Sequence, residues 1–472
     1  MSALWLALVG CPAPDTGDTD TGDPLHTTLP DDAETLPGPV TAYEAANLRA
    51  EAVAEQPSVL RVAWTQTIGA TVSVEFAFDG RTLRSPVRSL GPGSHEELLL
   101  GVPYDTDLTW HLVLDGPRGP ATTPDLHART GQLPFEVPDH QIQELDEARV
   151  DGTVTWFLVA IAQDPGFSEL WWTTIMDREG RIVWARRSPR QRATFYPRIG
   201  VDGDRILLDL DSYWGTFDGG DASQIQALTI DGAEVQRWDT PGLHHSFTQM
   251  PDHTLLYGSY TGGPNRLDED VMALAPDGTR TVLFDCGDWL DREGFEGQCG
   301  SNTVSYDPAT DRVLVSWFTL DAVTELAWPT GTVTRLFGNL PGAFSFDPAD
   351  AQFWYQHGVH RLPDGHLLLS THAEHPHTSE LVVREYVVDD QQHALRQVAV
   401  LGRGEGVPGE QMGEAHRLSN GNTLHNFGTN AHLREYTPDG DVVWEVDWQN
   451  GLEIGRTEPI LVDLYELAPT RP

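Results

Sequence analysis

The stretch Asp177-Arg178-Glu179-Gly180-Arg181-Ile182-Val183-Trp184 joins a glycine-containing turn to a strand that ends in tryptophan. Successive turn glycines lie about 50 residues apart, and the last gap is about twice as long. A period near 50 residues in a sequence of short strands is typical of propeller blades. Roughly 335 residues at that period predict a six-bladed β-propeller over residues 135–472. The related stretches are Asp231–Trp238, Pro276–Thr279, Pro329–Val333 and Pro438–Trp444.

A second motif, strand then Asp- or Asn-centred turn then strand, runs out of phase with the first. Its clear copies begin at His245, His357 and Glu414, and weaker copies cover 195–208 and 302–315. His245 and His357 each stand seven residues before the turn aspartate, and Asn302 lies 57 residues after the first histidine and 55 before the second. Equivalent positions in successive blades lie at similar heights, so we expect these three residues to line one mouth of a central channel.

The residue types in this set predict an anion-handling site. Histidine is a nucleophile and a proton donor, and asparagine donates an amide N–H. Transfer of a sulfuryl group should resemble phosphoryl transfer, which needs donors around the equatorial oxygens and an in-line nucleophile. Two alternatives stay open. The histidines can be structural, bonding strand to strand, or His372, His375 and His377 can hold a metal, although no familiar ligand spacing is completed.

Upstream of the repeats, residues 41–134 predict a separate small domain. Residues 41–56 contain Ala42, Glu44, Ala45, Leu48 and Ala50, and predict one short helix. From residue 59 onward the runs at 59–64, 72–76, 97–100 and 110–114 alternate partly between apolar and polar residues and are separated by Gly, Pro and Asp. This pattern is typical of an antiparallel β-sandwich of the fibronectin or immunoglobulin kind.

The N-terminal segment indicates export. Residues 1–11 resemble a bacterial lipoprotein signal ending at Cys11, which would carry the lipid, although the segment contains no Lys or Arg before that cysteine. Residues 12–40 begin with a Pro/Asp/Thr/Gly tract that predicts a flexible tether. In an oxidising compartment, Cys286 and Cys299 would form a disulfide across a polar loop. We therefore expect an exported lipoprotein, periplasmic or on the cell surface, that meets the membrane only through its lipid anchor.

Charge excludes one class of partner. The formal net charge is −41, and all 30 basic residues are arginine. Such a surface repels phosphate backbones, so we expect no nucleic-acid partner. An anionic small substrate would need arginine and histidine gathered locally. The charge leaves oligomeric state open.

The motifs together resemble the arylsulfate sulfotransferases over residues of about 140–468. The resemblance implies that a channel histidine takes a sulfuryl group from an aryl sulfate and passes it to a phenol, with no cofactor or metal. Gln356-His357 matches the motif of the nucleophile, His244 or His245 matches a supporting histidine, and Asn302 matches the Asn of a His-x-Asn motif. The stretches that carry the resemblance are His244–Phe247 with Pro251-Asp252, Ser301–Asp307, Gly331–Val333 with Leu336–Gly338, Gln356-His357, Leu418–Leu424 and Glu435–Gly440.

Three family positions differ in this chain. Gly300 stands where the His of the His-x-Asn motif is expected, Phe318 where a sulfate-binding Arg is expected, and Ser246 where a His-His-Asp motif has Asp. Each lost donor costs on the order of 3 kcal/mol in the barrier. We expect His416, Arg361 and Arg417 to contribute to substrate binding, and Arg198, Arg361 or Arg417 to replace the missing arginine. The alternative is a non-catalytic ligand-binding or scaffold propeller on the cell envelope.

Overall fold

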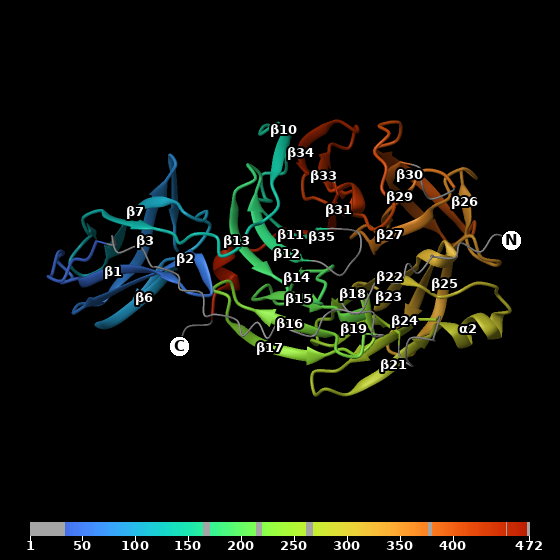
Figure 1. The fold of residues 1–472 in the computed structure, drawn as a ribbon, viewed down its shortest axis with the longest axis horizontal. Helices are drawn as coiled ribbons and strands as arrows, with labels where there is room; N and C mark the ends of the chain where they lie inside the picture. The colour runs from blue at the N-terminus through green and yellow to red at the C-terminus, as the bar shows by residue number, and fades with distance from the viewer. Residues whose placement is uncertain are drawn as a thin grey trace, which may run out of the picture.

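The structure is a computed structural model and describes residues 34–163, 170–213, 220–260, 268–375, 380–449 and 451–469. Cys11, His377 and the expected signal and most of the tether lie outside these residues. In the described ranges almost all of the regular secondary structure is β-strand (Figure 1). No helix among those ranges is long and apolar enough to cross a membrane.

The N-terminal part consists of two sheets that share one apolar core. Trp64 of one sheet and Trp110 of the other are both buried in this core. The first sheet contains β1 (Ala46–Val53), β2 (Gln56–Gln66) and β6 (Gly93–Leu99). The second contains β3 (Ala70–Phe78), β4 (Arg81–Arg84), β5 (Arg88–Leu90), β7 (Asp107–Asp115), β8 (Ala121–Thr122) and β9 (Leu126–Arg129).

The helix expected over residues 41–56 is wrong, because this segment contains strand β1. Leu48 and Ala50 are buried while Asn47, Arg49 and Glu51 are exposed, which is a period of two. The strand pairs antiparallel with β2. The alanine content favoured a helix, but burial of alternate residues against the neighbouring strand decided the structure.

Residues 140–460 form six further sheets among the described residues. One sheet contains β11 (Trp156–Gln163), β12 (Trp171–Asp177), β13 (Ile182–Arg187) and β35 (Leu452–Ile460). The next contains β14 (Arg198–Ile199), β15 (Ile206–Leu210), β16 (Gln224–Leu228) and β17 (Glu234–Asp239). The third contains β18 (Leu243–Gln249), β19 (Leu255–Ser259), β20 (Asp270–Leu274) and β21 (Arg280–Asp285).

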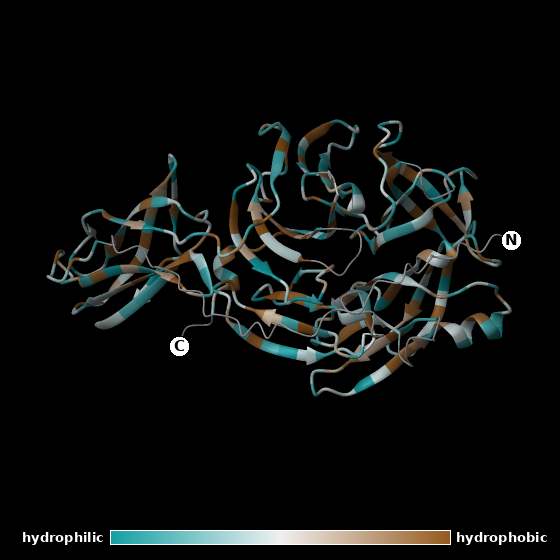
Figure 2. Cartoon of the chain, viewed as in Figure 1, coloured by the Kyte–Doolittle hydropathy of each residue, from teal (hydrophilic) through white to brown (hydrophobic). Residues whose placement is uncertain are grey.

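The other three sheets complete the set. The fourth sheet contains β22 (Ser301–Asp307), β23 (Arg312–Trp317), β24 (Ala322–Ala327) and β25 (Thr332–Gly338). The fifth contains β26 (Ser345–Asp347), β27 (Trp354–Arg361), β28 (Leu367–His372), β29 (Leu381–Asp389) and β30 (Ala394–Leu401). The sixth contains β10 (His140–Leu145), β31 (Glu414–Arg417), β32 (Thr423–Asn426), β33 (His432–Tyr436) and β34 (Val442–Trp448). Figure 2 shows hydrophobic residues concentrated on the strands, where neighbouring sheets pack.

The first and last strands of this region each pair with a strand from the opposite end of the region. The early strand β10 pairs with β34, placing His140 opposite Trp448. The last strand, β35, pairs with β11, placing Leu158 opposite Glu458. Segments about 300 residues apart in sequence are therefore hydrogen-bonded, which holds the first and last sheets together.

The repeated turns lie where the sequence places them. Gly180 joins β12 to β13 at φ 83°, and Gly440 joins β33 to β34 at φ 91°. Glycine adopts this left-handed backbone without a Cβ clash, which explains its recurrence. The long last gap in the repeat is also explained, because β29 and β30 are joined by Asp389–His393, a turn without glycine in which His393 takes φ 51°.

The expected disulfide is confirmed, but its surroundings differ from the expected polar loop. Cys286 and Cys299 are bonded and both are buried. The segment after Cys286 is helix α2 (Cys286–Glu293), which begins after the N-cap Asp285 and ends at Gly294 in the left-handed conformation. The Asp285 carboxylate accepts from the Asp288 amide, which satisfies one free N–H at the helix start.

Strand β2 of the N-terminal part contacts β13 of the six-sheet part through side chains that bond to backbone. Gln56 Nε2 donates to the Ala185 carbonyl at 3.0 Å, and Ser58 Oγ donates to the Val183 carbonyl at 2.7 Å. The Tyr104 hydroxyl donates to Gln56 Oε1 and accepts from the Ala185 amide. Burial raises the pKa of Tyr104 to about 12, so this hydroxyl keeps its proton.

Candidate functional site

Six strands, one at the edge of each sheet, contact one another in a closed order. We call β14, β18, β22, β27, β31 and β35 the inner strands. Contacts join β18 to β22, β22 to β27, β27 to β31, β31 to β35 and β35 to β14. Arg198 of β14 closes the order by donating from Nε to the Phe247 carbonyl of β18 at 3.1 Å. In Figure 1 these strands lie toward the middle of the six sheets.

The sequence-predicted residues His245, Asn302 and His357 lie on three consecutive inner strands. Each of those strands has an irregular register at that residue, between Leu243 and Phe247, between Ser301 and Thr303, and between Trp354 and His357 respectively. A bulge re-aims the side chains beside it. His245 also has φ 60°, a conformation rare for residues other than glycine and common at functional sites.

His357 is buried, and both of its ring nitrogens have partners. Nδ1 donates to the Tyr355 carbonyl at 3.0 Å, and Nε2 accepts from the Met412 amide at 3.2 Å. Burial, with a further contribution from His245, lowers the pKa of His357 to about 3. The ring is therefore neutral, with its proton on Nδ1 and its lone pair on Nε2. This is the protonation state that a nucleophilic histidine needs.

His244 and His245 form a pair of buried rings beside a buried carboxyl group. Their ring centroids are 4.0 Å apart. Burial lowers the pKa of His244 to about 3 and, together with His244, lowers the pKa of His245 well below its usual value. Glu269 Oε1 lies 3.3 Å from His244 Nδ1. Burial raises the pKa of Glu269 well above its usual value, although Ser301 donates two hydrogen bonds to it.

Aromatic rings surround these histidines. Tyr213 and Tyr260 are stacked at 5.0 Å, and each meets the His244 ring edge to face. Phe318 lies parallel to His357 at 6.1 Å and meets Tyr355 edge to face. Aromatic faces of this kind pack well against an aromatic ligand.

The Asn302 amide bonds within the protein. Nδ2 donates to the Gln356 carbonyl at 2.7 Å, and Oδ1 accepts from the Thr303 hydroxyl at 3.2 Å. The Asn302 carbonyl accepts from the Tyr196 hydroxyl. In this structure Asn302 thus holds β22 against β27.

Three further sequence-predicted residues are held by carboxylates. Arg361 donates to the Gly365 carbonyl and pairs with the buried Glu325. Arg417 donates to Glu385 Oε2 at 2.6 Å. His416 Nε2 lies 3.1 Å from Glu414 Oε2. These carboxylates already neutralise the two arginines. The role of the three residues in substrate binding stays a prediction.

The two altered family positions, Gly300 and Phe318, occupy one space. A Cβ atom added at Gly300 would lie 3.0 Å from Phe318 Cε1 and 3.0 Å from Thr319 Cγ2. A side chain at 300 therefore requires the Phe318 ring and the Thr319 methyl group to give by a few tenths of an ångström. The two departures from the family pattern are coupled, and a single reversal at Gly300 would be obstructed.

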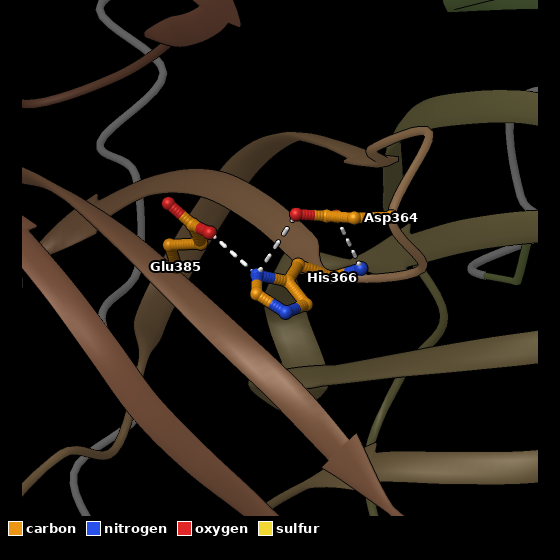
Figure 3. Close-up of side chains that lie close together, drawn as sticks. All are labelled: Asp364, His366 and Glu385. Carbon is orange, nitrogen blue, oxygen red and sulfur yellow. Dashed lines mark hydrogen bonds and ion pairs between the residues drawn. The ribbon is translucent and has the colours of Figure 1, made fainter. Parts of the chain in front are cut away.

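A metal-ligand arrangement occurs away from His372 and His375. Figure 3 shows Asp364 and Glu385 both directed at His366 Nδ1, at 3.4 and 2.6 Å. Among the described residues, this group is the one whose ligand atoms lie within 4.8 Å of one another. The Arg417 guanidinium bonds to the same Glu385 carboxylate and opposes a cation there.

Sequence reasoning missed two buried groups, Glu269 and Arg456. Glu269 lies in the acidic run 268–270, which leads into the buried strand β20. An acidic residue next to a buried strand was the signal that the sequence offered. Arg456 lies in the buried strand β35 and pairs with the buried Glu414. Arg456 is the one basic residue in this largely buried strand, which signals a buried partner, but the sequence does not name that partner.

Comparison with known proteins adds little about chemistry. No protein-family model and no curated protein matches the sequence. Similar solved structures include a putative 6-phosphogluconolactonase from Bacteroides uniformis (12% identity, TM-score 0.42, 82% of this chain and 99% of that chain). Others are a protein of unknown function from Bacteroides caccae (16%, 0.41, 62% and 93%) and inactive virginiamycin B lyase from Staphylococcus aureus with quinupristin (10%, 0.38, 64% and 87%). At these levels function must be argued from the site itself.

Proposed function

We propose that this chain is an arylsulfotransferase-like protein that moves a sulfuryl group from an aryl sulfate to a phenolic acceptor through His357. The six sheets with their closed order of inner strands support a six-bladed β-propeller. The two N-terminal sheets around one core support the fibronectin-like β-sandwich before it. Export and lipid anchoring at Cys11 are part of the proposal and rest on the sequence.

The observation that carries the proposal is the fixed protonation state of His357. Its Nδ1 proton is held by the Tyr355 carbonyl, so Nε2 keeps its lone pair. In the first step Nε2 bonds to the sulfur of the aryl sulfate and the bond from sulfur to the aryl oxygen breaks. In the second step the acceptor oxygen bonds to sulfur and the bond from sulfur to Nε2 breaks.

The departing phenolate needs a proton, and Glu269 is the group placed to supply one. Burial raises the pKa of this carboxyl well above its usual value, which favours the protonated form that the proposed step uses. His244 lies beside it and His245 beside His244, which gives a route toward the reacting atoms. The acceptor phenol returns a proton along the same route, so the protein is unchanged after one cycle.

The aromatic surroundings favour an aryl ligand. Phe318, Tyr355, Tyr213 and Tyr260 lie around the histidines. In the bound state the Met412 amide must leave Nε2, since a nitrogen lone pair cannot both accept that hydrogen bond and attack sulfur.

The test is turnover of a chromogenic aryl sulfate with a phenol acceptor. We expect acceptor-dependent release of the chromophore by the wild type and its loss in His357→Asn. The matched control is His432→Asn, which should keep the activity. His432 is a half-buried histidine of β33 that pairs with Glu445 and Asp447 of β34. Equal turnover in wild type and His357→Asn would reject the proposal.

A second candidate is a non-catalytic ligand-binding propeller. It is favoured by the internal hydrogen bonds of the Asn302 amide and of His357 Nε2, and by Phe318 at the expected arginine position. Binding of a phenol or aryl sulfate without turnover by the folded wild type would select this candidate.

A further inference from the structure

A second group of charged side chains lies on the inner strands, formed by residues that the transfer step does not use. Arg456 of β35 is only 3% exposed. It pairs with Glu414 of β31 through Nε and Nη2, and its Cζ lies 4.9 Å from the centre of the Tyr196 ring. Its Nη1 has no acceptor among the described residues. A buried guanidinium nitrogen without an acceptor costs free energy, and such a group indicates a ligand or ion position.

Arg198 lies next to this group on β14. Its Nε donates to the Phe247 carbonyl, and within the described part of the chain it forms no ion pair. Two contacts fix its position relative to β35. Tyr196, two residues earlier, lies under Arg456, and the amide of Ile199, the next residue, donates to Glu458 Oε2 at 3.2 Å. The two arginines thus lie on adjoining strands of the ring, and the charge of Arg456 adds to burial in lowering the pKa of Arg198 to about 10.

The other charged groups here leave an excess of donors. Glu414 is occupied by Arg456 and by His416. Glu458 and Asp209 are the other carboxyl groups near Arg198, and burial raises the pKa of each. Asp209 accepts from the Phe195 and Tyr196 amides. His360 stacks on His416 with centroids 5.7 Å apart. The sequence-predicted candidates Arg361 and Arg417 differ from Arg198, because each is already paired with a carboxylate.

We propose that Arg198 and Arg456 bind a small tetrahedral oxyanion of the sulfate type within the ring of inner strands. Guanidinium groups present fixed N–H donors that match the oxygens of such an anion. The site takes over the function of the arginine expected at Phe318, with its two arginines on β14 and β35. This inference rests on the proposed function for the choice of sulfate as the ligand. Equilibrium binding of sulfate does not require sulfuryl transfer to His357.

The test is calorimetric titration of the folded wild type with sodium sulfate, with sodium chloride at matched ionic strength as the blank. We expect saturable sulfate binding that is weakened about tenfold or more in Arg198→Met, since a charge-assisted hydrogen bond contributes at that level. Arg198→Lys should bind with intermediate affinity. Arg335→Met removes a half-buried arginine of β25 that pairs with Asp390 and Glu325 outside the proposed site, and this variant should bind sulfate as the wild type does. His357→Asn should also bind sulfate normally while losing turnover, which separates the two proposals.

A second measurement keeps the test valid if the Arg198 variants do not fold. Wild-type crystals grown with selenate should show an anomalous peak within hydrogen-bonding distance of Arg198 and of Arg456 Nη1. The inference would be overturned if selenate bound only on the outer surface of the protein, because that result would show an adventitious ion only. Equal sulfate affinity in folded Arg198→Met and wild type would also overturn it.

Discussion

The Nε2 atom of His357 accepts a hydrogen bond from the Met412 amide at 3.2 Å. Met412 has φ 63° and is followed by Gly413 at φ 113°, so the segment that covers His357 Nε2 has an uncommon backbone. In the proposed transfer, binding of a substrate must displace this amide from His357 Nε2.

The double variant Gly300→His, Phe318→Arg is expected to raise transfer activity by about tenfold or more, because each restored donor stabilises charge in the transition state. Gly300→His alone should gain nothing and should lower stability, since its Cβ meets the Phe318 ring at 3.0 Å. Steady-state kinetics with a chromogenic aryl sulfate and thermal unfolding check both statements. An active Gly300→His single variant of full stability would contradict the coupling of the two positions.

Glu414→Gln is expected to lower the free energy of unfolding by about 3–5 kcal/mol, because it leaves Arg456 buried without its counter-charge. The measurement is chemical denaturation at pH 7. Glu414→Gln combined with Arg456→Met should recover part of that loss. A cost below about 1 kcal/mol for the single variant would mean that the pair is not buried as described.

Acidification should destabilise the protein below about pH 6.5, the usual pKa of histidine in an unfolded chain. Burial lowers the pKa of His357, His244 and His425 to about 3 each. The unfolded chain therefore binds more protons between these values, and stability present above pH 6.5 is lost as the pH falls. Each such histidine contributes a slope of about 1.4 kcal/mol per pH unit.

His425→Asn isolates this contribution, because His425 bonds to the Ser370 hydroxyl and lies outside the proposed transfer step. Its unfolding free energy, measured by denaturant titration at pH 7, 6 and 5, should fall with pH less steeply than that of the wild type, by about one histidine's slope. Asp209 acts in the opposite sense, since burial raises its pKa to about 7, but it is common to both proteins. Identical slopes would contradict the expectation.

Replacing both Cys286 and Cys299 by serine should lower the free energy of unfolding by about 3 kcal/mol, because the bond closes a loop with a sequence separation of 13 residues. Denaturant unfolding without reductant, compared with the wild type under the same conditions, measures this. Wild type treated with reductant is the control and should lose a similar amount. No difference between variant and wild type would contradict a stabilising role.

The sequence predicted the parts of the fold that repeat locally. Turn glycines such as Gly180 mark hairpins because only a left-handed residue closes them, and the repeat therefore gives the sheet spacing. The copy between β29 and β30 was missed because His393 adopts the left-handed conformation in place of glycine. The helix expected at 41–56 was wrong because local propensity gave way to burial on β2.

The candidate site was predictable only where its residues follow the repeat of the sheets. His245, Asn302 and His357 lie on three consecutive inner strands, which their spacing in the sequence predicted. The partners that set their chemistry come from elsewhere. The Met412 amide is a backbone group with no sequence signal, and Glu269 reaches His244 only through sheet pairing. Spacing could place His357 on its strand but could not show that the Nε2 lone pair accepts a hydrogen bond from a backbone amide.

The most direct measurement of the central claim is a rapid-quench reaction of the wild type with a reactive aryl sulfate in the absence of acceptor, followed by peptide mass spectrometry under conditions that preserve phosphoramidate-like bonds. We expect one sulfuryl group on the peptide that contains His357, lost again when a phenol acceptor is added and absent in His357→Asn. Release of chromophore without any sulfuryl group on His357, or modification of a different residue, would contradict it.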